Sequence, residues 1–212
     1  KRTVFSIIVI SIFFSAFTLL YGKEINLESL PSNTIYLKEN ETIQLILKEK
    51  LYIYNVKPEL NNYSNIPNIK INKQNLTPSI QYNSRFLERN SKFTVSSNQL
   101  GTYYLRFSKK PILGSGQLIS SKPIHHLKQY HIIQVVVRKN DTYLGYLTEL
   151  LNTPFLIMPK YINNIGHQTS LRVGSDCIHF TIYGKRRSEG YYPYLGFKQL
   201  INALKVSKKA PI

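Results

Sequence analysis

The sequence predicts an α+β protein in which an all-β part is followed by a mainly helical part. Two observations support this prediction. Apolar residues recur with a period of two from residue 33 to about residue 138, and the period changes toward 3.6 from residue 140 onward. The chain has 212 residues, of which 42% are hydrophobic, so it is long enough to bury a substantial core. Before both parts stands a charge-free apolar run. We therefore expect three parts, over residues 1–22, 33–138 and 140–212.

The first part predicts that the protein is exported. Lys1 and Arg2 precede an apolar run that carries no charge until Lys23. The run exceeds the ~7 to 15 apolar residues of a usual signal peptide and just reaches the ~20 residues that span a bilayer. Residues 1–22 therefore fit either a signal peptide or a membrane anchor, which places the protein in the periplasm or cell envelope. No cysteine follows the run, which excludes a lipoprotein anchor.

The second part predicts strands. Short runs of β-branched and aromatic residues alternate with clusters of turn-forming residues. Several short strands at this spacing predict an immunoglobulin-like β-sandwich over residues 33–138. The expected strands are 42–47, 51–56, 69–71, 79–82, 93–96, 102–107 and 132–138.

The third part begins with a predicted helix over residues 142–151. Asn140 or Asp141 is expected to cap its first turn, and Pro154 to force its end. An irregular loop follows, and a further helix is expected over residues 197–204.

Between that loop and the last helix, an amphipathic helix is expected to begin at Cys177. Ser175 or Asp176 is its expected N-cap. Three cations at positions 185–187 fall in its last turn, where they complement the helix dipole, and Gly190 can terminate it.

Cys177 is the residue that most directly suggests chemistry. It is the only cysteine of the chain, so no intramolecular disulfide can form. A thiol at the start of a helix is placed where the helix dipole stabilises a thiolate, which is how nucleophilic cysteines are activated. The alternative is a buried thiol that acts as a small apolar side chain.

The charge predicts association with polyanions. The 28 Lys and Arg against 11 Asp and Glu give a formal net charge of +17. The basic residues are scattered singly and no nucleic-acid-binding motif accompanies them, so no nucleic-acid partner is expected. Anionic cell-envelope polymers such as peptidoglycan, or lipid headgroups through an uncleaved leader, are the expected partners. The alternative is that lysines only cover solvated faces.

The order of motifs from residue 141 onward resembles the front half of the NlpC-type cysteine peptidases of the papain-like superfamily. A helix and Thr153-Pro-Phe155 are followed by a loop, by Asp176-Cys177 at the start of a helix, and then by Gly190, Pro193 and Gln199. The resemblance implies an exported hydrolase of peptidoglycan stem peptides, and members are often joined to small β modules. Two features depart from the family pattern: Ile178-His179-Phe180 replaces the small residues after the cysteine, and the aromatic-Gly-Gly segment before it is missing.

The family's histidine base comes from a strand beyond the cysteine helix, about where this sequence ends. Either the segment over 140–212 is truncated or the general base is unusual. His167 lies in the loop that approaches the thiol and is the candidate base within the chain, with lining of the site or no role as the alternatives. His179 stands two residues after Cys177 in the expected helix, where the two side chains do not face each other.

The predicted function is therefore thiolate acyl transfer to an amide in a cell-wall peptide, catalysed by Cys177 with a histidine that is either His167 or missing from this segment. The alternative is a non-catalytic envelope-binding protein with a degenerate hydrolase segment. No metal and no cofactor is expected. An N-cap and an exposed loop cation are the structural alternatives for Asp176 and Arg172. The expected substrate-binding residues are Arg172, Ser175, Asp176, His179 and Tyr183.

Overall fold

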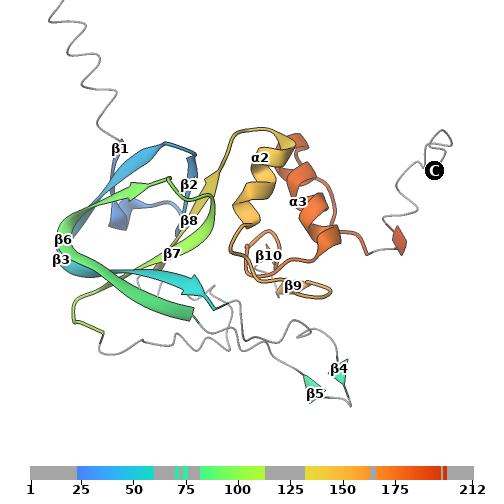
Figure 1. Ribbon diagram of the computed structural model, residues 1–212, viewed down its shortest axis with the longest axis horizontal. Helices are drawn as coiled ribbons and strands as arrows, with labels where there is room; N and C mark the ends of the chain where they lie inside the picture. The colour runs from blue at the N-terminus through green and yellow to red at the C-terminus, as the bar shows by residue number, and fades with distance from the viewer. Residues whose placement is uncertain are drawn as a thin grey trace, which may run out of the picture.

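The computed structural model describes residues 23–59, 70–71, 74–75, 82–112, 132–162, 166–196 and 198–199. In these residues the chain is mostly β, with a curled sheet and two short helices packed beside it (Figure 1). The leader predicted over 1–22 and most of the helix predicted over 197–204 lie outside the described residues. No helix in the described ranges is long and apolar enough to cross a bilayer.

The main sheet is mixed. Its strands run in the order β1–β3–β7–β8–β2, and β6 pairs with the free side of β3. The β1–β3 and β2–β8 pairs are parallel and the other pairs are antiparallel. The strands are β1 (Lys23–Asn26), β2 (Thr34–Lys38), β3 (Thr42–Pro58), β6 (Tyr82–Ser96), β7 (Gly101–Ser108) and β8 (Ile132–Arg138), with a 3-10 turn at Leu27–Ser29.

The curl of the sheet comes from β3, which has 17 residues. Its first half, around Ile43–Ile46, pairs with β1, whereas its second half, Tyr52–Val56, pairs with β7. Between Ile46 and Leu51 its register against β6 shifts, and such irregularities bend and twist a strand. Strand β3 therefore pairs with β1 along its first half and with β7 along its second half, on either side of the bend.

The predicted immunoglobulin-like sandwich over 33–138 is wrong. The expected strands 42–47 and 51–56 are one continuous strand, and a single mixed sheet curls on itself where two antiparallel sheets were expected. The short strands β1 and β2 were not predicted at all. Both owe their place to pairing with strands distant in sequence, which local periodicity does not report. The strands predicted at 102–107 and 132–138 are confirmed as β7 and β8.

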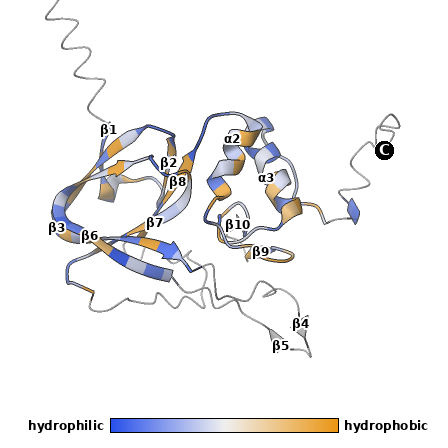
Figure 2. Ribbon diagram, in the orientation of Figure 1, coloured by the Kyte–Doolittle hydropathy of each residue, from blue (hydrophilic) through white to orange (hydrophobic). Residues whose placement is uncertain are grey.

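The interior of the curled sheet is apolar. Leu45, Ile53 and Val135 are fully buried and pack with alternate residues of β2 and β7. Successive residues of a strand point to opposite faces, and Figure 2 shows hydrophobic and hydrophilic residues interleaved along β3 and β6. Each fully buried aliphatic side chain contributes about 1.5–3 kcal/mol relative to its exposed state.

Strand β8 is covered on both faces, because all residues from 132 to 137 are buried. Ile133, Val135 and Val137 face the interior of the sheet. On the opposite face, the Gln134 side-chain amide donates to the carbonyl of Leu171 at 3.0 Å. The helical part of the chain therefore attaches to the outer face of β8.

The helical part consists of α2 (Tyr143–Leu147), a 3-10 turn η3 (Thr148–Leu150) and α3 (Cys177–Glu189). Between them lies a loop with the two-residue strands β9 (Tyr161–Ile162) and β10 (Gly166–His167). A second two-residue pair, β4 (Lys70–Ile71) with β5 (Gln74–Asn75), lies apart from the main sheet (Figure 1).

The predicted mainly helical papain-like segment over 140–212 is wrong in its secondary structure. Among the described residues of this segment, only α3 is longer than two turns, and α2 has five residues. The N-cap of α2 is Thr142, not Asn140 or Asp141. The Thr142 hydroxyl accepts from the Gly145 N–H at 3.1 Å and donates to Asn140 Oδ1 at 2.6 Å. The sequence-based prediction chose the wrong capping side chain because three capping residues stand in a row.

Helices α2 and α3 pack closely because Gly184 has no side chain. A Cβ at Gly184 would lie 2.6 Å from Leu147 Cδ2 and 2.9 Å from Tyr143 Cε2. The Tyr143 hydroxyl also donates to the carbonyl of Thr181 on α3 at 3.3 Å. These contacts hold α3, and with it Cys177, against the rest of the chain.

Candidate functional site

The site begins with Cys177, which is the first residue of the 13-residue helix α3 and is exposed to solvent. The interpretation of this thiol as a buried apolar side chain is therefore wrong. At the first helical position it lies beside backbone N–H groups that have no partner within the helix. Both ends of α3 lie where they were predicted: of the two expected N-caps, Ser175 and Asp176, the structure has Asp176, and Gly190 is the C-cap.

Asp176 holds the start of this helix. Its Oδ1 accepts from the His179 backbone N–H at 2.8 Å and pairs with His179 Nδ1 at 2.6 Å, and the Met158 N–H also donates to the carboxylate. Burial raises the pKa of Asp176, but the hydrogen bonds from His179 and Met158 outweigh it and leave the pKa below its ordinary value. The carboxylate predicted to bind substrate is thus engaged by groups of the protein itself.

The loop before Cys177 lies against the segment that follows η3. The Ser175 N–H donates to the Pro154 carbonyl at 3.0 Å, and the Leu156 N–H donates to the Ser175 carbonyl at 2.9 Å. This approach requires Gly174, because a Cβ there would lie 1.9 Å from Leu156 Cδ1. Ser175, predicted to bind substrate, is buried, and its hydroxyl donates to the Asp176 carbonyl at 3.2 Å.

The rings of His167 and His179 stack on each other beside Asp176, the N-cap of α3. Their ring centroids are 4.9 Å apart, and the Tyr194 ring stacks on His167 at 3.8 Å. His167 Nε2 lies 3.0 Å from the Pro159 carbonyl, and its Nδ1 accepts from the Thr169 N–H at 3.3 Å. The ring is therefore the neutral tautomer with its proton on Nε2.

Burial, followed by the nearby His179, lowers the pKa of His167 to about 4. Both ring nitrogens of His167 are engaged in hydrogen bonds, and its lowered pKa makes it a weak base. In this arrangement His167 packs against His179 and is not placed to take a proton from the thiol. Among the residues that the structure describes, no hydrogen bond joins the Cys177 sulfur to an imidazole. His125, His126 and His131 lie outside them.

Three exposed apolar side chains come from the loop that lies beside Asp176, the N-cap of α3. Phe155, Met158 and Tyr161 are 47%, 58% and 60% exposed, and they come from the loop that is hydrogen-bonded to Ser175 and Asp176. The Tyr161 ring packs edge-on against His167 at 5.0 Å. Large apolar groups at the surface are typical of binding sites when they are contiguous.

Beneath α3 lies a polar cluster that the sequence-based interpretation missed. Glu149 is fully buried and accepts from Arg187 Nε at 3.1 Å and Nη2 at 3.0 Å, and Tyr183 also donates to it. Burial raises the pKa of Tyr183, which keeps its hydroxyl protonated as a donor. The one available signal was a glutamate placed between the apolar residues Leu147 and Leu150.

Arg172 belongs to this cluster, so the interpretation of Arg172 as an exposed loop cation is wrong. It is 5% exposed, and it donates Nε and Nη2 to Gln134 Oε1 at 3.2 and 2.7 Å and Nη1 to the Tyr183 hydroxyl at 3.2 Å. Arg172 and Tyr183 were predicted to bind substrate together with Asp176 and His179. The structure separates the two pairs, because Arg172 and Tyr183 line a cavity toward the far end of α3.

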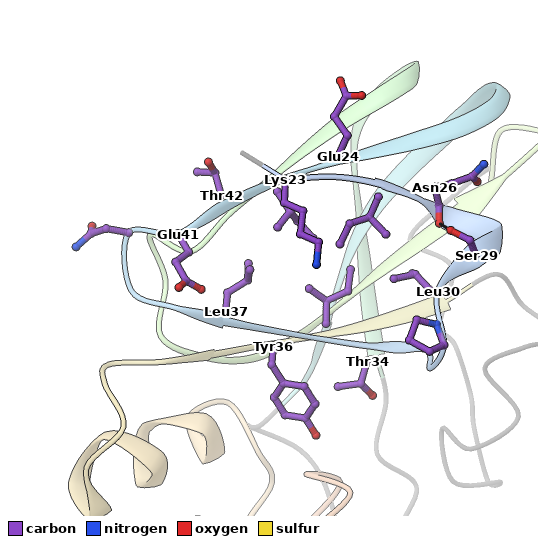
Figure 3. A pocket seen from close by; sticks show the side chains of 15 residues that line it. Lys23, Glu24, Asn26, Ser29, Leu30, Thr34, Tyr36, Leu37, Glu41 and Thr42 are labelled. Carbon is purple, nitrogen blue, oxygen red and sulfur yellow. Dashed lines mark hydrogen bonds between the residues drawn. The ribbon is translucent and has the colours of Figure 1, made fainter. Parts of the chain in front are cut away.

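A larger cavity of about 790 Å³ opens between β1, β2 and the start of β3 (Figure 3). Its lining includes the apolar residues Leu30 and Leu37. Figure 3 shows the Lys23 side chain pointing into it between β1 and β2, with Glu41 at the turn that joins β2 to β3. None of the predicted site residues lines it. No group of three or more metal-ligating side chains that could hold a metal ion occurs among the residues described.

The fold and the site together define a mixed β protein that carries an exposed thiol at the start of a helix packed on its sheet. Comparisons of the chain with protein-family models, with curated proteins and with solved structures found no match.

Proposed function

We propose that the protein is an exported cell-envelope cysteine hydrolase that cleaves an amide bond in peptidoglycan stem peptides. The observation that carries the proposal is the placement of the only thiol of the chain, which is exposed at the first residue of α3. The apolar run over 1–22 and the net charge of +17 agree with a site of action in an anionic envelope.

The chemistry is acyl transfer. The Cys177 thiolate attacks the amide carbonyl carbon, the C–N bond breaks, the leaving amine takes a proton, and water then hydrolyses the thioester. The backbone N–H groups of Cys177 and Ile178, which have no intrahelical partner, stabilise the oxyanion, whereas that of His179 is engaged by Asp176. The exposed side chains Phe155, Met158 and Tyr161 supply apolar surface for the peptide beside the thiol.

Asp176 and His167 act as positioning residues in this proposal. Asp176 fixes the first turn of α3 through its hydrogen bonds to His179, and the His167 ring stacks on the His179 ring. The proton for the leaving amine then comes from a group other than His167. Substituting the five histidines one at a time with Gln, and measuring amide hydrolysis, identifies that group.

The first experiment measures the release of new amino groups from isolated peptidoglycan by the purified protein and by Cys177→Ala. We expect release by the wild type and none by the variant, with circular dichroism spectra that agree between the two. Equal release by both proteins contradicts the role of the thiol, and an inactive wild type contradicts the substrate class.

A second experiment needs no substrate. Because Cys177 is the only cysteine, iodoacetamide reports on this thiol alone. If the exposed thiol acts as a nucleophile in the folded chain, alkylation near neutral pH should be faster than in the same chain unfolded in urea. Equal or slower alkylation of the folded chain favours the alternative function, a non-catalytic envelope-binding protein.

A further inference from the structure

A second cavity lies between strand β2 of the sheet and the C-terminal half of α3. Its volume is about 290 Å³, close to the lower end of the range for small-molecule sites (~300–1,000 Å³). The residues that matter for its chemistry are Tyr36, Ser170, Arg172, Arg186, Arg187 and Tyr191. Arg186 lies nine residues after Cys177 on α3, about 14 Å along the helix axis. The cavity is therefore distinct from the thiol site.

The charges that line the cavity do not balance. Arg187 forms a bidentate pair with the buried Glu149. Arg172 and Arg186 form no ion pair among the described residues, and their side chains contact neutral groups: Gln134 and Tyr183 for Arg172, and the carbonyl of Tyr192 for Arg186. Two guanidinium groups thus lack a carboxylate partner.

Arg172 makes this imbalance costly. The side chain is almost fully buried, and a buried charge is unfavourable unless an opposite charge compensates it. Its backbone has φ = 57°, a left-handed conformation that is uncommon for arginine and that occurs preferentially at ligand-binding positions. The Glu149 carboxylate favours the charge of Arg172 but is already paired with Arg187. The guanidinium groups of Arg172 and Arg187 therefore share one buried negative charge, and an anionic ligand would supply a second.

The guanidinium groups also have unused donors. Arg172 uses Nε, Nη1 and Nη2 once each, which leaves two of its five N–H bonds, and Arg187 directs Nε and Nη2 to Glu149 and keeps Nη1. Arginine forks match the oxygen pairs of carboxylate and phosphate groups.

Tyrosine rings hold the cations in place. Tyr36 points from β2 away from the cavity of Figure 3, and its ring centroid lies 5.2 Å from the Arg172 guanidinium carbon and 5.0 Å from that of Arg187. Tyr191 and Tyr194 contact the Arg186 guanidinium at 5.3 and 4.7 Å. Such contacts stabilise cations and orient them.

We propose that this cavity is a binding site for an oxyanion, a carboxylate or phosphate group carried by a small anionic molecule or by an anionic polymer. Arg172 and Arg187 form its floor, and Arg186, which is half-buried, forms its edge. The site does not depend on the function proposed for Cys177.

The test measures binding of inorganic phosphate and of glutarate by isothermal titration calorimetry at constant ionic strength, with the full chain. The two probes distinguish a phosphate from a carboxylate ligand. We expect saturable binding of at least one probe, and a loss of about tenfold or more in affinity for Arg186→Gln, because one charge-assisted hydrogen bond is removed. Arg186→Lys keeps the charge without the fork and should bind with intermediate affinity.

Lys185→Gln is the matched control. It removes the same charge from the neighbouring position of α3, but Lys185 pairs with Glu189 and does not line the cavity. Less than a twofold change is expected for this variant. Cys177→Ala should bind as the wild type does, so a failure of the hydrolase proposal leaves this result unaffected.

A measurement on the wild type avoids dependence on folding of the variants. Phosphate or glutarate should slow the modification of Arg186 by phenylglyoxal, mapped by mass spectrometry, without slowing the modification of Arg89, an exposed arginine on β6. Absence of saturable binding by both probes, equal loss of affinity in Lys185→Gln and Arg186→Gln, or equal protection of both arginines would each overturn the proposal.

Discussion

The two faces of strand β8 are packed by different chemistry. On the inner face, Val135 and its neighbours pack within an apolar cluster of the curled sheet. On the outer face, Gln134 bonds to Arg172 and to the carbonyl of Leu171, above the buried Glu149. The sheet is thus held by apolar burial, which has no directional preference, whereas the helical part is held by directional, charged contacts.

This difference teaches how the thiol is positioned. Apolar packing tolerates small shifts, because many similar arrangements bury the same area. A buried carboxylate that binds Arg187 and Tyr183 accepts few geometries, so Glu149 restricts how α3 can lie against η3. Polar contacts therefore fix the place of Cys177, and the stability of the site should depend on charge where that of the sheet does not.

The largest effect on the charged contacts of the helical part is expected when Glu149 is removed. Glu149→Ala leaves Arg187 without its carboxylate and should lower the free energy of unfolding by about 3–5 kcal/mol, measured by urea denaturation. Hydrogen exchange should rise mainly in η3 and α3. Glu189→Ala, which removes only an exposed ion pair with Lys185, is the control and should leave the denaturation midpoint almost unchanged. Equal effects of the two variants would contradict the role of the buried cluster.

The sheet offers the apolar counterpart. Leu45→Ala removes a fully buried side chain and should lower the free energy of unfolding by about 2–5 kcal/mol. Here we expect hydrogen exchange to rise throughout the sheet and the helical part together, since the helices pack on β8. The half-buried Ile46 on the same strand should show a smaller loss in Ile46→Ala. Exchange confined to the helical part in Leu45→Ala would contradict the comparison.

A smaller effect is expected where the helical part meets its own loop. Gly174→Ala forces a Cβ into Leu156 and should lower the free energy of unfolding by about 1–3 kcal/mol, a usual effect of overpacking. Because this loop leads directly to Cys177, the rate of alkylation by iodoacetamide should also change. Gly196→Ala is the control, since its Cβ would meet an ordinary contact at 3.8 Å. No change in either measurement would show that the loop does not position the thiol.

The smallest expected effect is a pH dependence that belongs to the helical part alone. The pKa of His167 is lowered from 6.5 to about 4, so below pH 6.5 the unfolded chain binds a proton that the folded chain does not. Stability should therefore fall as the pH drops from about 6.5 to about 4. Denaturation midpoints between pH 7 and pH 5 avoid titration of Asp176, and His167→Gln should flatten the slope. An unchanged slope in that variant would assign the dependence to another group.

Local signals predicted those elements that are formed by neighbouring residues. The runs at 102–107 and 132–138 alternate in hydrophobicity and are strands, and the helix that begins after Asp176 and ends at Gly190 carries its own start and stop signals. The same reasoning missed β1 and β2, which pair with β3 and β8, and it divided β3 in two at its irregular register. It also extended a helical period over a segment that is mostly loop.

The candidate site was predictable only in part. The Asp176–Cys177 pair at a helix start was visible in the chain, and the exposure of the thiol agrees with it. The surroundings of His167 could not be predicted from the sequence, because the Pro159 carbonyl and the Tyr194 ring contact it only in the folded loop. The arginine-lined cavity escaped notice because its residues come from β2, the loop and α3.

By itself, the sequence determined the apolar alternation of the sheet, the start and end of α3 and the single thiol at its first residue. These are properties of residues within a few positions of one another, which backbone geometry and capping decide locally. The tertiary structure alone decided that Arg172 is buried, that Glu149 binds Arg187 and that His167 is kept neutral. Each of the two charged contacts joins residues 38 positions apart, Arg172 with Gln134 and Arg187 with Glu149, and such contacts exist only once the chain has folded around β8.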